Sequence, residues 1–580
     1  MREHRKRRIL ETVTAILLVV TTLALTGFTS EAKTTRKTAK KSTKTAATAK
    51  KTTAATTSET ASYKLTIPAA LITGSNVTVT VTGTVQATDD GLYHLYAQQP
   101  YESGVQGTEV ANAAAAQTQT FTFALNNNSA FSMLFKKFVV VGAVGGKLTK
   151  LSNAQYITNP EAIAAKAAAR YDGGGKKGVL LSAHLIDRTD YLTDLGIDQI
   201  TYNLPVGNLM TDPSLGFESY TYNGKTYRFS KAILGQYDII VPKMNKCGIS
   251  VTLILLNNLT SDTNLIHPQS LDGTGANYYA FNTANAAGTE ELEAIASFLG
   301  KRYSGEHGTV DNWIVGNEVN ARAEWNYINA AVGETYAAKA YTDAVRIFYN
   351  GILSQNANAR VYVGIDHEWS RSDGIPAELH YGGKSFLTSV QAAAAAEGNF
   401  NYGVATHPYN VPLYNALTWA PAIQNSVTDD QNSVYVTMAN IDVLTDFLCQ
   451  KKNLQTDGQV RSVLCSEVGY TSLPSHSYAS DDNVQSAALA FGMLQAMNNQ
   501  YIDGFFNREV DDPAEIVQIS DGQPDNLAMG VLSTPDWKTF TPKKAYNTYK
   551  YIDDPSQQAA ILQDASATIG QDITTLIHAR

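Results

Sequence analysis

Two glutamates stand where short apolar runs stop. Residues 311–320 read Asp-Asn-Trp-Ile-Val-Gly-Asn-Glu-Val-Asn, so this run ends at the Asn317–Glu318 pair. Residues 463–470 repeat the pattern, with Glu467 at the end of a second apolar run. A run of four or five apolar residues between polar ones predicts a buried parallel strand, and a carboxylate at its C-terminal end indicates chemistry. We therefore interpret Glu318 and Glu467 as a catalytic carboxylate pair.

The elements that must position this pair form a regular series between residues 170 and 580. Amphipathic segments separate the apolar runs, as in 290–303, where Leu292, Ile295 and Leu299 recur at helical spacing. Eight strand–helix units in about 400 residues predict an α/β fold, a (β/α)8 or TIM barrel, because no glycine-rich nucleotide turn follows the first strand. The predicted strands span residues 178–184, 199–204, 249–256, 313–318, 361–366, 402–407, 463–467 and 502–507.

Polar and aromatic side chains gather at the ends of these strands, which form the active face of such a barrel. Amides, carboxylates and flat aromatic rings suit sugars, which offer C–H faces for stacking and hydroxyl rims for hydrogen bonds. A single histidine or glutamate there can also serve structure alone, by capping a loop or pairing with an arginine. The predicted substrate-binding residues are Asn203, Asn257, Asn317, Trp325, Trp369, His407, Tyr409 and Arg508, with further aromatic candidates at Tyr220, Tyr222, Tyr227, Tyr278, Tyr279 and Phe281.

The chain ahead of the barrel divides into three parts. Residues 1–32 are basic, then apolar, then small, which predicts a secretory signal peptide; an uncleaved anchor is the alternative. Residues 33–60 are almost entirely Lys, Thr, Ala and Ser, which predicts a disordered linker. Its eight basic residues suggest a second role, holding a polyanionic cell envelope. Residues 61–158 alternate polar and apolar positions between turn clusters, which predicts a small accessory β-sandwich, and an Ala-rich helical connection follows at 160–170.

The net charge and the cysteine content argue against two other classes of protein, nucleic-acid binders and disulfide-rich proteins. Residues 61–580 hold 32 Lys and Arg against 49 Asp and Glu, a formal net charge of −17, which disfavours nucleic acid as a partner. Three cysteines, Cys247, Cys449 and Cys465, are too few for a disulfide framework. We expect Cys465 to be a buried free thiol that faces the barrel interior, because it lies two positions before Glu467 on one strand.

The strand ends Trp-Ile-Val-Gly-Asn317-Glu318-Val-Asn320 and Ser466-Glu467 resemble those of the clan A glycoside hydrolases, which are retaining (β/α)8 enzymes. The resemblance implies that Glu318 is the acid/base, Glu467 the nucleophile and Asn317 the amide that holds the substrate 2-hydroxyl. It also implies that His407 and Tyr409 line that subsite and orient the nucleophile. The chain is most similar to an uncharacterised family of secreted bacterial proteins in this clan, described only by a domain of unknown function.

This chain departs from the clan pattern at two positions. Val319 stands where a proline often follows the acid/base, and Phe506-Asn507-Arg508 stands where many members place a tryptophan. We expect a secreted, monomeric retaining glycoside hydrolase that needs no cofactor and cleaves a β-linked oligo- or polysaccharide. The alternatives are a glycan-binding surface protein without catalysis and a metal-dependent barrel hydrolase with ligands His184, His367, His407 and Asp511, although the first strand lacks a His-x-His pair.

Overall fold

The computed structural model describes residues 63–168, 175–273, 275–370, 379–420, 426–474, 478–508, 511–512, 528–536 and 538–580. The predicted signal peptide and linker, residues 1–60, lie outside this part of the chain. Within it, no helix combines the length and the apolar character that crossing a membrane requires.

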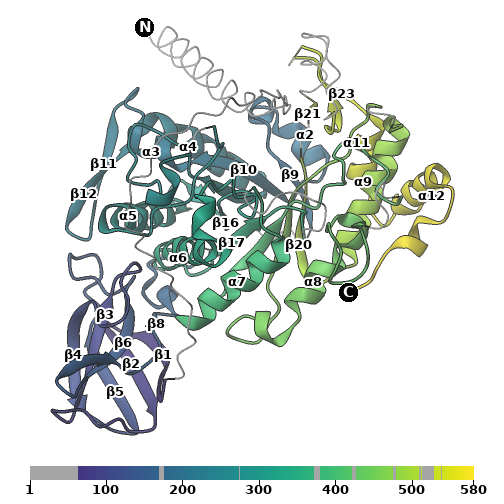
Figure 1. The fold of residues 1–580 in the computed structure, drawn as a ribbon. Coiled ribbons are helices and arrows are strands. Elements are labelled where there is room, and N and C mark those ends of the chain that lie inside the picture. Colours follow the sequence, from purple (N-terminus) through teal and green to yellow (C-terminus); the bar gives the residue numbers. More distant parts are fainter. Residues whose placement is uncertain are drawn as a thin grey trace, which may run out of the picture. The chain divides into compact units, whose positions relative to one another are not determined.

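Eight parallel strands close into a barrel, in the order β10-β13-β16-β17-β18-β19-β20-β9 (Figure 1). The predicted TIM barrel is confirmed, and each strand overlaps its predicted apolar run, although β9 ends at residue 180 and not at 184, and β16 ends at 315 and not at 318. The strands are β9 (Lys177–Leu180), β10 (Gln199–Pro205), β13 (Ser250–Leu256), β16 (Asn312–Val315), β17 (Arg360–Ile365), β18 (Gly403–Thr406), β19 (Val463–Val468) and β20 (Ile502–Asn507).

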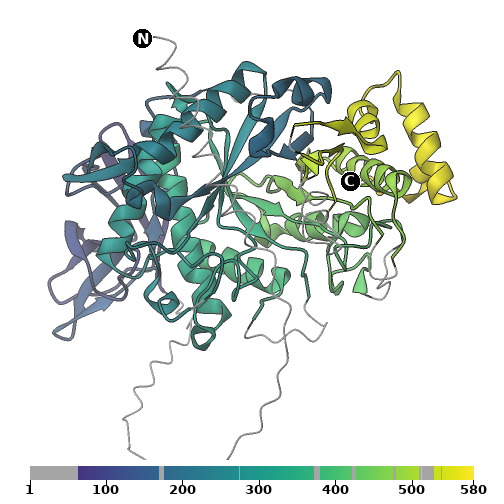
Figure 2. The same cartoon turned by 90° about the horizontal axis from the view of Figure 1, so that it is seen from above.

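Helices lie outside the barrel strands in both ribbon views (Figures 1 and 2). Several begin at a side chain that caps free backbone N–H groups, as Ser230, Asn285 and Asp481 do for α4, α5 and α9. The helices are α2 (Thr189–Asp194), α3 (Val206–Thr211), α4 (Lys231–Lys246), α5 (Ala286–Arg302), α6 (Glu334–Leu353), α7 (Gly383–Ala396), α8 (Asp442–Leu448), α9 (Asp482–Met497), α11 (Lys544–Tyr551) and α12 (Gln558–Ile569).

One apolar cluster fills the barrel interior. It takes one or two side chains from each of six strands, Ile254, Leu256, Ile314, Tyr362, Ala405, Leu464 and Phe506, and Tyr278 packs against it. Only the inner face of a closed barrel brings side chains from so many strands together. This layer therefore fills the barrel interior below the C-terminal ends of the strands.

The interior position of Leu464 shows that the predicted direction of Cys465 is wrong. Cys465 is free and fully buried as expected, but it follows an inward residue and so faces the helices. Cys465 pairs with Phe505 and Val468 with Asn507, so two residues of β19 lie opposite one residue of β20. This β-bulge breaks the alternation between Cys465 and Glu467.

An all-β unit precedes the barrel, as the alternating pattern predicts. One sheet has the order β1-β2-β5 and the other β4-β3-β6-β7 with β8 beside β6, and the rings of Phe123 and Phe138 meet between them at 5.2 Å. The domain boundaries at 61–158 and 170–580 stay predictions. The strands are β1 (Leu65–Thr73), β2 (Asn76–Gly83), β3 (Leu92–Gln98), β4 (Thr108–Ala114), β5 (Thr118–Ala124), β6 (Lys137–Val144), β7 (Lys147–Lys150) and β8 (Gln155–Tyr156).

A buried ion cluster joins this sandwich to the barrel helices. Glu397, at the end of α7, lies 2.7 Å from Lys137 of β6 and 3.0 Å from Lys339 of α6. The Arg346 guanidinium lies 4.5 Å from the ring centre of Tyr156 and 4.2 Å from that of Phe400. Charged groups with so little access to water are held by their partners, so these contacts tie the two folds together.

Two segments differ from their predicted roles. The connection at 160–170 forms only a short 3-10 turn, Pro160–Ile163, in its described part, because Lys166 and Ala168 bond with the turn at Gln355 and Asn356. The tyrosines after the second barrel strand lie on a hairpin of β11 (Phe217–Tyr222) and β12 (Lys225–Ser230). Tyr220 of this hairpin bonds Ser297 of α5, so the hairpin packs on the outer helices.

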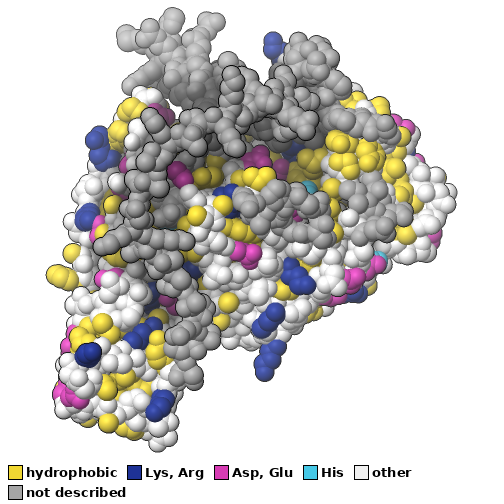
Figure 3. Space-filling view, viewed as in Figure 1, with side chains coloured by type: hydrophobic (Ala, Val, Ile, Leu, Met, Phe, Trp, Pro, Cys, Tyr) yellow, Lys and Arg dark blue, Asp and Glu magenta, His cyan; other side chains and the backbone are white. Residues whose placement is uncertain are grey.

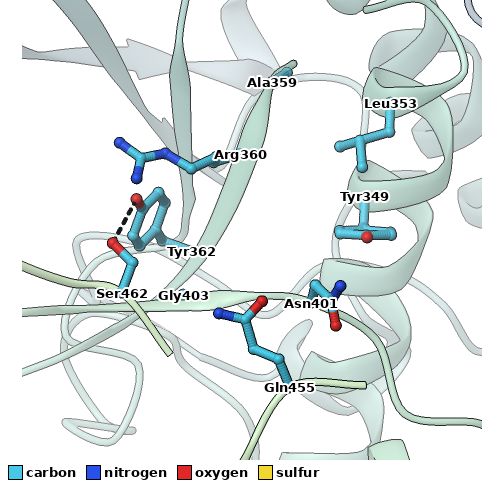
Figure 4. A pocket seen from close by; sticks show the side chains of 9 residues that line it. All are labelled: Tyr349, Leu353, Ala359, Arg360, Tyr362, Asn401, Gly403, Gln455 and Ser462. Atoms are coloured by element: carbon cyan, nitrogen blue, oxygen red, sulfur yellow. Dashed lines mark hydrogen bonds between the residues drawn. The ribbon is translucent and has the colours of Figure 1, made fainter. Parts of the chain in front are cut away.

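A cavity of about 180 Å³ lies at the opposite end of the barrel from the strand C-termini. Figure 4 shows Arg360, Tyr362 and Ser462 on one side of it and Tyr349 and Leu353 of α6 on the other, with Tyr362 and Ser462 joined by a 3.0 Å hydrogen bond. On the face shown in Figure 3, Lys and Arg side chains occur singly or in small groups among the acidic ones. The residues that line the cavity do not include the predicted carboxylate pair.

The ion cluster at Glu397 yields a stability prediction. Replacement by glutamine leaves Lys137 and Lys339 without their shared carboxylate, so Glu397→Gln should lower the free energy of unfolding in urea by about 3 kcal/mol. Glu290, which pairs with Lys225 at the surface, is the matched control. Glu290→Gln should change the free energy of unfolding by less than about 1 kcal/mol.

The same cluster predicts a pH dependence. Burial opposes ionisation of Glu397, but Lys339 and Lys137 outweigh it and lower its pKa from 4.5 to about 2. A lowered folded-state pKa stabilises the fold above the unfolded value, and this contribution disappears as the pH falls from 4.5 towards 2. Wild-type protein should therefore lose more stability over that interval than Glu397→Gln. Equal losses would contradict the assignment.

Candidate active site

Glu318 lies just past β16 in an unusual backbone conformation. Its φ angle is +43°, and the other non-glycine residues with positive φ in the described chain are all asparagines. Gly316, with a φ of +76°, has already ended the strand, which explains why β16 is shorter than predicted. A left-handed conformation costs a side chain with a Cβ about 1–2 kcal/mol. Such strain is kept where the surrounding structure enforces it, often at functional sites.

Glu467 reaches the same place by a different irregularity. The bulge at Ser466 and Glu467 turns the glutamate towards the barrel mouth, where Tyr409 Oη donates a hydrogen bond to Glu467 Oε1 at 2.6 Å. Arg508 Nε, just past β20, lies 3.6 Å from the same oxygen. Residues from the two neighbouring strand ends, those of β18 and β20, thus converge on the carboxylate that β19 carries.

His407 connects the two glutamates. Its Nδ1 lies 2.7 Å from Glu318 Oε1 and 3.9 Å from Glu467 Oε2, and its side chain is almost fully buried. Glu318 Oε1 and Glu467 Oε2 can therefore lie at most 6.6 Å apart, which is the sum of these two distances. The predicted pair is brought together across the mouth, and the side chains of Glu318 and Glu467 keep exposed fractions of 17% and 20%.

Burial and charge set the pKa values in this group. Loss of water around the Glu318 carboxyl raises its pKa, the bond from His407 lowers it, and the charges of Asp366 and Glu467 raise it further. Burial lowers the pKa of His407, but Glu467 and Glu318 outweigh this and the net direction is upward. Burial and the charge of Glu467 raise the pKa of Tyr409 well above its usual value, so its phenol remains a donor.

One side of the barrel mouth carries aromatic rings and an amide side chain. Trp325 is partly exposed and lies 5.9 Å from Tyr278, ring centre to ring centre. Burial raises the pKa of Tyr278 to about 12, and the charge of Glu467 adds to this effect, so this side is near the carboxylates. Asn203 pairs in register with the inward-facing Ile254, and its side chain is exposed. Trp325 and Asn203 are thus placed where a ligand can reach them.

Two predicted residues, Asn257 and Trp369, are covered by protein and lie away from the open part of the mouth. Asn257 is buried and donates its amide hydrogens to the carbonyls of Leu265 and Ala280, which fastens the loop after β13. Trp369 is 2% exposed and packs edge-on against Phe447 of α8, so its ring is covered by protein. Asn317 is partly exposed beside Glu318.

A buried polar network behind Glu318 includes a residue that the sequence reasoning missed. Asn320 donates to Asp366 Oδ1 at 2.6 Å, and His380 Nε2 lies 2.6 Å from Asp366 Oδ2. Asp366 stands at the end of a predicted strand, and Asn320 belongs to the motif around Glu318. His380 carried no signal, because it lies in a loop 14 positions beyond Asp366.

The metal-site alternative predicted His184, His367, His407 and Asp511 as ligands. Among the residues that the structure describes, no three His, Cys, Asp or Glu side chains are grouped to hold a metal ion. His184 lies 3.0 Å from Ser182 Oγ, whereas His407 bonds Glu318. The side chain of Asp511 is outside the described residues.

A family model with the description "Family of unknown function (DUF5722)" matches residues 169–576, which is more than half of the chain. The chain belongs to this family. A comparison with curated proteins finds no match.

The chain is also similar to solved structures of glycosidase barrels. They include the hyperthermophilic β-glucosidase from Pyrococcus furiosus, with a TM-score of 0.41 and 13% identity, covering 67% of this chain and 87% of that chain. The family 1 β-glucosidase from Thermotoga maritima has a TM-score of 0.38 and 10% identity, covering 64% of this chain and 86% of that one. The Ignisphaera aggregans GH53 catalytic domain has a TM-score of 0.39 and 13% identity, covering 66% and 98%. At these identities the similarity extends to the fold alone.

Because Glu318 has a left-handed conformation, we predict that glycine at this position gives a more stable protein than alanine, which is the reverse of the usual order. Glycine adopts positive φ without steric cost, so Glu318→Gly should unfold at higher urea concentration than Glu318→Ala, by about 1 kcal/mol in free energy. The neighbouring Asn317 has a negative φ and is the control. There glycine should be less stable than alanine, by about 0.5–1 kcal/mol. Equal stability of the two Glu318 variants would mean that the position is unstrained.

Proposed function

We propose that this protein is a glycoside hydrolase that cleaves β-linked glycans with retention of configuration. The observation that carries the proposal is the pair of carboxylates held around His407 at the mouth of the barrel. Retaining enzymes place their two carboxyl groups about 5–5.5 Å apart, and inverting enzymes about 6.5–9.5 Å apart. The two oxygens nearest His407 lie at most 6.6 Å apart, which accommodates the spacing of a retaining pair, and the stereochemistry of the product tests this part of the proposal.

The two carboxyl groups have unequal surroundings, as two different roles require. Glu318 has a raised pKa because its carboxyl has lost water and has acidic neighbours, which suits a group that must carry a proton at the start of the reaction. Glu467 is oriented by the Tyr409 hydroxyl and has the Arg508 guanidinium nearby, which suits a carboxylate that attacks. We assign Glu318 as acid/base and Glu467 as nucleophile.

The reaction proceeds in two displacements on this assignment. Glu467 attacks the anomeric carbon, and the bond to the leaving oxygen breaks while Glu318 gives that oxygen its proton. Glu318, now a carboxylate, takes a proton from water, and the water oxygen displaces Glu467 from the glycosyl-enzyme. His407 lies within reach of both carboxylates and can compensate for the charge that moves between them.

The surroundings of the pair support a sugar as the substrate. The exposed amide of Asn203 and the Trp325 ring beside Tyr278 offer a hydrogen-bonding group and a flat surface. Asn317, next to Glu318, is proposed to hold the substrate 2-hydroxyl. Secretion and a monomeric state belong to the proposal too, and the predicted signal peptide that supports secretion lies at residues 1–32.

The nucleophile assignment is tested with Glu467→Gln, which removes the charge with little change of shape. Turnover of a β-glycan from a polysaccharide panel should fall by more than about a thousandfold, since the covalent step needs a carboxylate. Substrate binding by calorimetry should persist. Glu324→Gln, on the exposed loop after β16, is the control and should keep wild-type turnover. If Glu467→Gln kept more than about a tenth of wild-type kcat, a loss below 1.4 kcal/mol, it would not be the nucleophile.

Stereochemistry is the second part of this test. Early-time proton NMR of the released sugar should show the anomer of the substrate, because two inversions restore the configuration. Azide should restore turnover of an activated aryl glycoside by Glu318→Ala and give a glycosyl azide of the same configuration. An initially inverted product would rule out the covalent route and make Glu467 a general base.

A further inference from the structure

The backbone that carries Glu318 is fastened to the end of β17. Asn320 donates its amide to Asp366 Oδ1 at 2.6 Å and accepts a hydrogen bond from the Asp366 backbone N–H at 3.0 Å. Val319, between Glu318 and Asn320, donates its N–H to the Gly364 carbonyl at 3.0 Å. Both residues that follow the strained glutamate are therefore fixed to one strand end.

A loop segment closes this arrangement from the other side. His380 Nε2 lies 2.6 Å from Asp366 Oδ2, the oxygen that Asn320 leaves free. Tyr381 donates its N–H to the Asn320 carbonyl at 2.8 Å, and its own carbonyl accepts from the Asn320 amide at 3.2 Å. Asn320 is fully buried and Asp366 is 7% exposed, so these bonds form away from solvent. Such a set persists because breaking it leaves buried polar groups without partners.

This set offsets the strain at Glu318. A left-handed glutamate would relax to a more favourable conformation if the residues after it were free to move. The reciprocal bonds between Asn320 and Asp366 prevent that movement, because they fix the side chain and the chain direction two residues beyond Glu318. The direction of the Glu318 carboxyl group towards His407 thus depends on groups that do not contact the barrel mouth themselves.

The same set also places a charge behind Glu318. Among the charged groups that act on Glu318 are His407, Asp366 and Glu467. Burial opposes ionisation of Asp366, but His380, with His367 and the Asn320 amide, outweighs it and lowers the pKa of Asp366. Asp366 is therefore a carboxylate at neutral pH, and a negative charge near Glu318 favours the protonated form that a general acid needs.

We propose that Asn320, Asp366 and His380 are positioning residues for Glu318, which fix the direction of its carboxyl group and supply the negative charge behind it. This inference rests on the proposed function, because it assigns these residues to the acid/base of the same reaction. It extends that function to groups outside the mouth, one of which is 62 positions from Glu318 in the sequence.

The kinetic test uses Asp366→Asn, which keeps the acceptor for Asn320 and can still donate to a neutral His380. The substrates are the 2,4-dinitrophenyl and phenyl glycosides of the sugar that the wild-type enzyme releases. Only the phenyl leaving group needs a proton, so kcat/KM should fall at least about tenfold for the phenyl glycoside and less than about threefold for the dinitrophenyl one. The alkaline limb of the pH profile for the phenyl glycoside should move to lower pH, because Glu318 loses a negative neighbour.

Asp311→Asn is the matched control. Asp311 is a buried carboxylate at the opposite end of β16, where Ser250 Oγ donates to it at 2.8 Å. This variant should leave the ratio of the two kcat/KM values and the alkaline limb unchanged, even if its thermal stability falls. An equal loss on both substrates in Asp366→Asn, with an unmoved pH profile, would reduce the cluster to a structural role and overturn the inference.

Two readouts do not depend on turnover. The pKa of Glu318 should fall in Asp366→Asn. It can be followed by carbon NMR of protein with carboxyl-labelled glutamate, and the signal can be assigned with Glu318→Gln.

The second readout is the free energy of unfolding in an Asn320→Ala background. There the stability advantage of Glu318→Gly over Glu318→Ala should shrink, because the chain is no longer held in the left-handed conformation. An unchanged pKa together with an unchanged advantage would overturn the inference. If the wild type hydrolyses no glycoside, the proposed function fails, while these two readouts still decide the role of the cluster.

Discussion

The regular alternation of side chains along a barrel strand is the constraint on which this site depends. Glu318 and Glu467 meet only because the backbone departs from regular geometry next to each of them. Glu318 takes a left-handed conformation after β16, and a bulge in β19 turns Glu467 inwards. A regular strand would have left Glu467 on the same face as Cys465, which faces the helices. The site is thus built from two local irregularities on an otherwise regular barrel.

Each irregularity is held by groups that come from other strands. Tyr409, beyond β18, and Arg508, beyond β20, hold the carboxylate that the bulge presents, and the end of β17 holds the turn at Glu318. Neighbouring parallel strands place their C-terminal ends side by side, so each end can brace the next. The closed barrel therefore does more than carry the site, since its neighbouring strand ends keep the departures from regular geometry in place.

The sequence was sufficient for the parts that depend on local pattern. All eight barrel strands follow apolar runs, and residues at the strand ends, such as Glu318, His407, Tyr409, Glu467 and Arg508, were predicted together because parallel strands end on one face. Features that depend on distant contacts were not predictable. A bulge leaves the pattern of residue types unchanged, Trp369 is covered by a helix that comes much later in the chain, and the hairpin after β10 turns towards α5. His380 depends on the path of a loop, which no periodicity reports.

The two ends of the barrel interior differ in how their charged groups are held, which supports the placement of the proposed chemistry at one of them. At the N-terminal end, Arg360 pairs with Asp503 at 2.7 Å, and Ser462 donates to the same carboxylate at 2.6 Å. Arg360 and Asp503 neutralise each other's charge, and their side chains keep exposed fractions of 25% and 38%. At the C-terminal end the carboxylates keep partial exposure, and their partners hold them in place without covering them. Two carboxylates that are held from behind and remain open towards the mouth leave room for a ligand, which is the arrangement that the proposed function needs.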